Sequence, residues 1–143
     1  MVRKPDPIDP LADRVLSLLA GRAEAAEIVL GGYFALQHYA PYRATHDIDA
    51  WWKSRAQPST EQVIREAMNR VATEAGCQLR ERRFGETISF EVGGGGKTRF
   101  SFQIAVRSVE LEPPLPSAWP PVLLETLADN VASKMNALVD RGA

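Results

Sequence analysis

The chain has 143 residues, of which 45% are hydrophobic and 24% charged, which suits one domain with a buried core. A formal net charge of −1 excludes a global attraction to nucleic acid or anionic membranes, so any polyanion must be bound locally. One cysteine, Cys77, excludes an internal disulfide and a multi-cysteine zinc site. We see no signal peptide and no apolar run near the roughly 20 residues that span a bilayer, so we expect a cytoplasmic protein without a membrane segment.

The first half of the chain is predicted to alternate helices with short strands. Residues 1–8 are predicted to be a loose arm, and Asp9 can cap a helix that begins at Pro10 and ends near Gly21. Apolar periodicity then predicts four further elements. These are a buried strand at 27–30, a short helix at 34–39, a strand at 45–52, and an amphipathic helix that Ser59 or Thr60 caps and Gly76 ends.

The second half is predicted to contain mostly strands, followed by one helix. Alternating apolar residues predict strands at 77–83, 86–92 and 98–106, and a proline-rich connection leads into a helix at 122–140. The order of elements favours an α+β fold, in which helices pack against a mixed β-sheet, with 1–143 as a single domain.

Gly96, Lys97 and Thr98 invite a P-loop interpretation. That motif needs a glycine five residues before Gly96, where this chain has Glu91. It also needs a helix to follow, whereas the next residues alternate as in a strand. A hairpin turn between two strands is the better interpretation.

Two short stretches carry residues suited to phosphate and metal chemistry. Gly31 and Gly32 follow a strand and precede a helix, where backbone N–H groups can approach phosphate oxygens without hindrance from a Cβ atom. Asp47 and Asp49 alternate with apolar residues, so both carboxylates project from one face of a strand. Neighbouring carboxylates repel each other, and a divalent cation relieves that repulsion. Alone, each stretch is more often a turn or a solvated strand face. Together they favour a site for a divalent metal ion next to phosphate-binding backbone groups.

These residues resemble the signature of the DNA polymerase β-like nucleotidyltransferase superfamily, in particular the AbiEii-type toxin nucleotidyltransferases. The matching residues are Leu30, Gly31, Gly32, Ala35, His38, Arg43, Thr45, Asp47, Ile48 and Asp49. The resemblance implies that Gly31 and Gly32 cradle the triphosphate of a nucleoside triphosphate (NTP). It also implies that Asp47 and Asp49 bind Mg²⁺, for which hard oxygen ligands are suited.

A second match lies near the end of the chain. The family has a Lys-x-x-Ala-Leu-x-x-Arg helix, and this chain has Lys134, Ala137, Leu138 and Arg141 at the same spacing. The resemblance implies that Lys134 and Arg141 contact nucleotide phosphates and that Lys134 neutralises charge on the leaving group.

The residues around Lys134 give an argument of their own. Lys134 falls within an apolar helical stripe made of Leu124, Leu127, Val131 and Leu138. A lysine there either meets an anion or extends its ammonium to water, and both interpretations stay open. Asn130, Lys134 and Arg141 lie along one line, so a polar seam could border the core.

Two features depart from the family pattern. The superfamily has a third carboxylate on a neighbouring strand, whereas the matching strand here has Gln103, which binds Mg²⁺ weakly and accepts no proton. Glu91 is nearby in sequence, but a hairpin centred on the glycines would pair it with Arg99. Relatives also continue past the position of Arg141, so we expect either a minimal form or a C-terminal truncation.

Other polar residues have two interpretations each. A zinc site at His38 or His46 is not favoured, because no cysteine or carboxylate stands at ligand spacing. For His46, a position on the strand face opposite Asp47 and a structural hydrogen bond are preferred. Trp51 shares the strand face of the aspartates and either borders a nucleotide pocket or is buried in the core. The basic run 80–83 either contacts a nucleic-acid backbone or forms a solvated strand edge.

The first hypothesis for the function is Mg²⁺-dependent transfer of a nucleoside monophosphate from an NTP to an acceptor hydroxyl. Asp47, Asp49 and Lys134 are the candidate catalytic residues. In toxin-like relatives the acceptor is a tRNA or a protein, so the resemblance also implies toxin–antitoxin biology and an antitoxin partner. The second hypothesis, favoured by Gln103, is a degenerate relative that binds a nucleotide or a partner without transfer.

Overall fold

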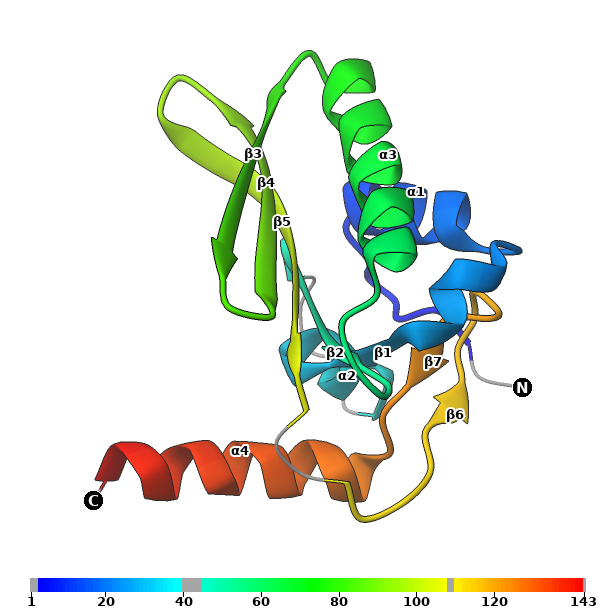
Figure 1. Cartoon of the computed structure of the whole chain (residues 1–143), viewed down its shortest axis with the longest axis vertical. Helices are drawn as coiled ribbons and strands as arrows, with labels where there is room; N and C mark the ends of the chain where they lie inside the picture. The colour runs from blue at the N-terminus through cyan, green and yellow to red at the C-terminus, as the bar shows by residue number, and fades with distance from the viewer. Residues whose placement is uncertain (1–2, 40–44, 108–109, 143) are drawn as a thin grey trace.

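The computed structural model describes residues 3–39, 45–107 and 110–142, with side chains as far as residue 136. Within these ranges the chain forms a seven-stranded mixed β-sheet with helices packed against it (Figure 1), which confirms the predicted α+β class. The helices are α1 (Pro10–Leu19), the short 3₁₀ helix η1 (Ala23–Glu27), α2 (Gly32–Tyr39), α3 (Pro58–Glu74) and α4 (Leu127–Gly142). The strands are β1 (Ile28–Gly31), β2 (Asp47–Trp52), β3 (Gln78–Phe84), β4 (Thr87–Gly94), β5 (Lys97–Val106), β6 (Leu115–Pro116) and β7 (Leu123–Leu124). In this described part, no helix combines the length and the apolar character needed to cross a bilayer.

β2, which carries the two aspartates, lies at the centre of the sheet. The strand order is β3-β4-β5-β2-β1-β7-β6. β2 is antiparallel to β1 and parallel to β5. β5 pairs in turn with β4, and β4 with β3, both in antiparallel fashion. The side chains of β2 therefore have neighbours from both flanking strands.

One face of the sheet forms the hydrophobic core, which α1 and α3 cover (Figure 1). Alternate residues of β2, β4 and β5 are buried on this face, namely Ile48, Ala50, Trp52, Ile88, Phe90, Val92, Phe100, Phe102 and Ile104. Each large side chain of this kind stabilises the fold by about 1.5–3 kcal/mol when buried. A slip of β2 by one residue would turn Asp47 and Asp49 into the core, so the apolar layer fixes the face on which both carboxylates lie.

The two long helices on the core side begin differently from each other. Asp9 caps α1 as predicted, since its side chain accepts a hydrogen bond from the backbone N–H two residues on, at 2.8 Å. α3 begins at Pro58 without a side-chain cap, and the Thr60 hydroxyl donates instead to the Glu24 carbonyl at 2.8 Å. The predicted cap at Ser59 or Thr60 is therefore wrong, because a proline in the first turn already supplies helical φ.

The N-terminal segment is irregular, as predicted, but it is held against the body. Pro5 is buried, and Lys4 forms an ion pair with Asp13 of α1 at 2.9 Å. The Lys4 ammonium also lies 5.8 Å from the centroid of the Trp119 ring. Residues 3–8 are thus less loose than the sequence predicts.

The last helix begins later than predicted. Leu123 and Leu124 extend the sheet as β7, parallel to β1, and α4 starts at Leu127 rather than at residue 122. Figure 1 shows α4 lying across one end of the molecule, crosswise to β5 and α3.

α4 also faces the sheet with the opposite side from the one predicted. Its apolar residues point outward, with Leu127, Val131 and Met135 exposed by 45%, 48% and 60%. The side that packs on the molecule is polar, and Asp129 and Asn130 are fully buried there. The prediction that Lys134 falls within an inward apolar stripe is therefore wrong, whereas the predicted polar seam through Asn130 does border the core.

Candidate functional site

Asp47 and Asp49 lie on the face of the sheet opposite the core, as their alternation predicts. Asp49 stands in register with Gly31 of β1 and with Gln103 of β5. Asp47 is exposed, and its Oδ1 accepts a hydrogen bond from the Ser101 hydroxyl at 2.6 Å. The centre of the sheet therefore combines two carboxylates with a neutral amide and a hydroxyl, and Gln103 occupies the place beside Asp49 that the sequence assigned to it.

Asp49 is the more buried of the two carboxylates. Burial, together with the negative charge of Asp47, raises the pKa of Asp49 to about 6. The Lys134 ammonium and the Tyr33 backbone N–H lower this pKa, but they do not cancel the rise. A carboxyl group whose ionised form is disfavoured in this way is a favourable place for a cation.

Gly31 and Gly32 lie directly beside the carboxylate pair. A Cβ atom at Gly32 would stand 2.4 Å from Asp49 Oδ2, and one at Gly31 would stand 2.1 Å from Trp51 Nε1. Gly32 also has a φ of +58°, a conformation that other residues rarely adopt. The glycine pair thus allows the side chains of Asp49 and Trp51 to approach the turn closely, a role that the spacing alone does not reveal.

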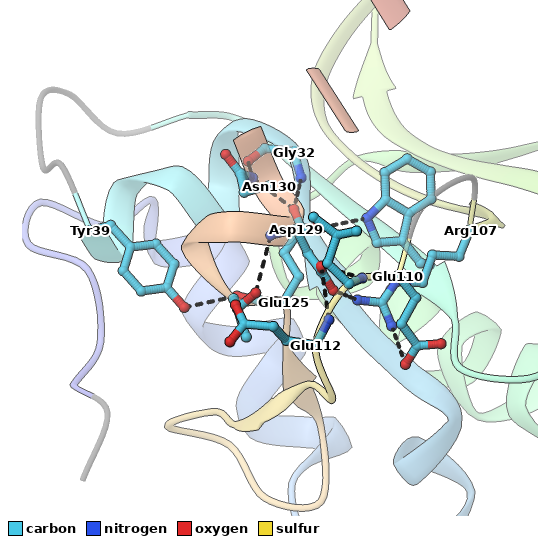
Figure 2. A network of polar contacts seen from close by, with 11 residues as sticks. Gly32, Tyr39, Arg107, Glu110, Glu112, Glu125, Asp129 and Asn130 are labelled. Atoms are coloured by element: carbon cyan, nitrogen blue, oxygen red, sulfur yellow. Dashed lines mark hydrogen bonds and ion pairs between the residues drawn. The ribbon is translucent and has the colours of Figure 1, made fainter. Parts of the chain in front are cut away.

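Glu125, which is fully buried, holds the turn at Gly32 (Figure 2). Its Oε2 accepts hydrogen bonds from the Gly32 N–H at 3.0 Å and from the Asn130 amide nitrogen at 2.7 Å. Its Oε1 accepts one from the Trp51 indole at 3.1 Å. Asn130 also donates to the Gly32 carbonyl at 2.8 Å, so both polar backbone groups of this glycine are bound. A phosphate could reach the Gly32 N–H only if Glu125 released it, and the phosphate contact of the glycine pair stays a prediction.

The backbone of Glu125 is fixed as well. Its N–H donates to the Leu30 carbonyl at 3.0 Å, and its carbonyl accepts from the Tyr39 hydroxyl at 2.8 Å. Burial raises the pKa of the Glu125 carboxyl, and the hydrogen bonds from Asn130, Trp51 and Gly32 oppose that rise. Three donors around one buried carboxylate thus link the start of α2, β2 and α4.

A second buried network fixes the start of α4. Asp129 is fully buried and binds the Arg107 guanidinium, while its Oδ1 accepts from the N–H groups of Leu111 at 2.6 Å and Glu112 at 3.2 Å. The Arg107 side chain is only 6% exposed and also pairs with Glu110 at 3.1 Å. Figure 2 shows Arg107 bridging Asp129 and Glu110 beside the start of α4. This network sets where α4 crosses the polar face of the sheet.

A cleft of about 340 Å³ lies over the carboxylate pair. It is lined by Tyr33, Thr45, Asp47, Asp49, Arg82, Phe84, Ser89, Glu91, Ser101 and Gln103. A second cavity of about 210 Å³ adjoins it, against α4. This cavity is lined by Gly32, Tyr33, Asp49, Ala50, Trp51, Gln103, Ala105, Glu125, Asn130, Ser133 and Lys134. Trp51 therefore borders a cavity and is not buried in the core, while its contact with a nucleotide stays a prediction.

Lys134 lies in the wall of the second cavity. Its Nζ is 3.7 Å from the centroid of the Tyr33 ring, and its charge acts on Asp49. The structure thus brings Lys134 to the carboxylates, while its contact with phosphate stays a prediction. The side chain of Arg141 and the whole of Arg43 lie outside the described residues.

The donor set fits Mg²⁺ that arrives with a phosphate ligand. Within residues 3–39, 45–107 and 110–136, no group of three or more His, Cys, Asp or Glu side chains is arranged to hold a metal ion. Asp47 and Asp49 supply two carboxylates beside the neutral oxygens of Gln103 and Ser101. Mg²⁺ in proteins is commonly held by one or two carboxylates, with substrate phosphates and water completing its shell. The pair therefore suits a nucleotide-bound ion better than a closed metal centre.

Glu91 lines the cleft but is bound by an arginine. Gly94 pairs with Lys97 around a two-residue turn, and a β-bulge between Val92 and Gly93 shifts the register by one more residue. Glu91 therefore lies opposite Ser101 and not Arg99, as was wrongly predicted. Its carboxylate pairs with Arg80 of β3 at 3.3 Å. Arg83, further along this edge strand, pairs with Glu61 at 3.1 Å. These ion pairs favour the solvated strand edge over a nucleic-acid contact for the basic run.

His46 makes a structural hydrogen bond, as preferred, and His38 makes one as well. His46 Nδ1 lies 2.7 Å from Asp9 Oδ2, and His38 Nδ1 lies 3.1 Å from the Phe34 carbonyl. Burial lowers the pKa of His38. Neither ring joins the aspartates.

Glu125 and Asp129 were not predicted from the sequence, although they fix the site from behind its open face. A signal was available, because Glu125, Asp129 and Asn130 recur at helical spacing beside the apolar stripe. Residues about four apart share one face of a helix, whether they are polar or apolar. The apolar face of this helix was predicted to be the buried one.

Comparisons of the chain with protein-family models, with curated proteins and with solved structures return no match. The likeness to nucleotidyltransferases therefore rests on the motif residues alone.

Proposed function

We propose that the cleft over Asp47 and Asp49 binds an Mg²⁺–NTP complex, and that the protein transfers the nucleoside monophosphate to an acceptor hydroxyl with release of pyrophosphate. The observation that carries the proposal is the carboxylate pair on the open face of the central strand. Asp49 is partly buried next to Asp47, and its raised pKa of about 6 marks a deficit of positive charge. Besides the Mg²⁺ ion, the Lys134 ammonium of α4 would supply positive charge to the bound phosphates.

Residues from β2 and α4 would hold the ion and the phosphates. Asp47, bound by Ser101, and Asp49, backed by Gly32, would hold the ion in one orientation. Bound Mg²⁺ would neutralise charge on the phosphate oxygens. Lys134 would offer its ammonium to the same oxygens. Gln103 accepts no proton, so we expect transfer to be slower than at a site with three carboxylates.

A second candidate function is binding of Mg²⁺–NTP without transfer. Gln103 stands in register with Asp49, where a third carboxylate would complete a two-metal site, and this observation favours the second candidate. A tRNA or protein acceptor, an antitoxin partner and a cytoplasmic location belong to the proposal through the family resemblance only.

Two measurements on the wild-type protein and an Asp49→Asn variant test the proposal. Calorimetry with ATP, CTP, GTP and UTP, with and without Mg²⁺, measures binding, and an NTP labelled at its α-phosphate measures transfer to cellular RNA and protein. Mg²⁺-dependent transfer that is lost in the variant supports the enzyme. Metal-dependent binding without transfer selects the second candidate. Unaltered transfer in D49N, or no metal-dependent binding of any NTP, would contradict the proposed site.

As a matched control we suggest Asp6→Asn, which removes an exposed carboxylate of the N-terminal segment. This variant should bind and transfer as the wild type does.

A further inference from the structure

The second cavity differs in character from the cleft that it adjoins. The cleft is lined mainly by polar groups of the strands, whereas the cavity lies between the sheet and α4 and is largely apolar. Both are lined by Asp49, Tyr33 and Gln103, so a ligand whose anionic end meets the aspartates can extend into the cavity. Its volume of about 210 Å³ is below the roughly 300–1,000 Å³ of sites for drug-sized ligands, which suits one ring system rather than a whole nucleotide.

The apolar part of the cavity combines a large and a small residue. Trp51 of β2 and Ala105 of β5 stand in register on adjacent parallel strands. The small alanine leaves space beside the indole that a larger side chain would fill. Glu125 binds the Trp51 indole N–H at 3.1 Å, which restrains the ring from rotating into that space. A fixed aromatic wall beside a recess is suited to a flat ligand.

The α4 wall of the cavity carries two buried oxygens that lack a partner. The Asn130 amide nitrogen donates to the Gly32 carbonyl and to the Glu125 carboxylate, which fixes the orientation of the amide. Its Oδ1 therefore points away from both, and it finds no hydrogen-bond partner among the residues that the structure describes. The buried Ser133 hydroxyl oxygen likewise has no hydrogen-bond partner among the described residues. Buried polar groups are nearly always bonded, so these two oxygens on successive turns of one helix are candidate acceptors for a polar group bound at the cavity.

From these three features we infer that the cavity is a nucleobase subsite, in which a planar heterocycle lies beside Trp51 and presents N–H groups to Asn130 and Ser133. The inference rests on the proposed function, because the phosphates of the same nucleotide would lie over Asp47 and Asp49. Asn130 Oδ1 can only accept a hydrogen bond, so the subsite selects a base edge with an amino or imino donor. Lys134, above the Tyr33 ring, forms the border between the base and the phosphates.

Calorimetry in the presence of Mg²⁺ separates the subsite from the cleft. The ligands are the four NTPs, ribose 5-triphosphate, which lacks a base, and inorganic tripolyphosphate. We expect at least one NTP to bind about tenfold more tightly than ribose 5-triphosphate. Equal affinity of ribose 5-triphosphate and all four NTPs would overturn the subsite while leaving the proposed cleft intact. No binding of any of these ligands would overturn both.

Two variants locate the subsite. Ala105→Leu fills the recess and should abolish the preference for the NTP over ribose 5-triphosphate, without changing the affinity for tripolyphosphate. Ser133→Ala removes one hydroxyl from the α4 wall and should reduce the same preference, which keeps the test open if A105L does not fold. Val106→Leu is the matched control, because it enlarges the neighbouring side chain, which is 53% exposed and points to the other face. A preference that survives both A105L and S133A would place the base elsewhere and overturn the inference.

Discussion

The backbone N–H of Gly32 donates a hydrogen bond to the carboxylate of Glu125 at 3.0 Å. In the family that the motif resembles, this glycine is expected to face a triphosphate. Here a carboxylate of the chain itself occupies the N–H and, through Asn130, the carbonyl of the same residue is bound as well. The turn beside Asp49 is therefore ordered by the protein's own buried groups before any ligand arrives.

Removal of the Glu125 carboxylate should destabilise the fold strongly. Glu125→Ala leaves buried donors on Gly32, Trp51 and Asn130 without an acceptor, and we expect a loss of about 3 kcal/mol in the free energy of unfolding. Glu125→Gln keeps one acceptor oxygen and should lose less. Urea denaturation measures both, with Glu112→Ala as a control on an exposed glutamate. Equal stability of E125A and the wild type would refute the role of Glu125 as the link.

The stability of the protein should depend on pH through Asp49. Its folded-state pKa of about 6 lies above the value of about 3.9 expected for an unfolded chain. The folded state binds the proton more tightly, so this contribution to stability is complete below about pH 4 and is lost as the pH rises through 6. Asp49→Asn should therefore have a larger free energy of unfolding than the wild type at pH 7. We expect a difference of about 2 kcal/mol, which is less than the pKa difference alone would give, because Asp49 is partly in contact with solvent.

Urea denaturation of the wild type and D49N at steps between pH 4 and pH 7 measures this difference. The two curves should approach each other at low pH and separate as the pH rises. Parallel curves would show that Asp49 is not the titrating group.

Two glycines in the same backbone conformation offer a matched pair of substitutions. Gly32 and Gly85 have φ values of +58° and +61°, so alanine at either position costs about 1 kcal/mol in backbone strain. At Gly85 the new Cβ meets nothing within 4 Å, whereas at Gly32 it would stand 2.4 Å from Asp49 Oδ2. We expect G32A to lose clearly more stability than G85A and to bind Mg²⁺–NTP more weakly. Thermal unfolding and calorimetry measure the two effects, and equal losses in both variants would argue against the close contact.

The Arg107–Asp129 pair should show strong coupling. Both side chains are buried, so Asp129→Leu leaves the Arg107 guanidinium with the exposed Glu110 as its ion-pair partner. The variant also removes the acceptor of two backbone N–H groups, and it should cost about 3–5 kcal/mol. Replacing both residues together, as Arg107→Met with Asp129→Leu, should cost less than the sum of the single changes. A double-mutant cycle by urea denaturation measures the coupling energy. Additive losses would mean that the two residues act independently.

The sequence predicted the parts of the fold that depend on alternation and on strong local signals. In β2, β4 and β5 every second residue is apolar and buried, so the face on which Asp47 and Asp49 lie could be predicted correctly. The position of Gln103 beside Asp49 also followed, because the parallel register of β2 and β5 agrees with the predicted match.

What the sequence could not supply is the direction in which a helix faces. The repeat of α4 contains an apolar and a polar stripe, and the polar one is buried because Glu125, Asp129 and Asn130 find donors and acceptors on distant segments. Those partners come from the start of α2 and from the segment after β5, which no local pattern connects to α4. The position of the turn and the β-bulge together place Glu91 opposite Ser101. Both are likewise properties of the paired strands, because the pattern of a single strand does not show where its partner carries an extra residue.

The polar attachment of α4 has a mechanical consequence. Apolar surfaces can slide over each other with a gradual change in energy, but hydrogen bonds of about 3 Å are either formed or lost. Because directional contacts of Asp129 and Asn130 attach α4 to Arg107, Gly32 and Glu125, it has one discrete position along the molecule. The wall that carries Ser133 and Lys134 is therefore expected to be either in place or released as a unit, and not to adjust by small steps.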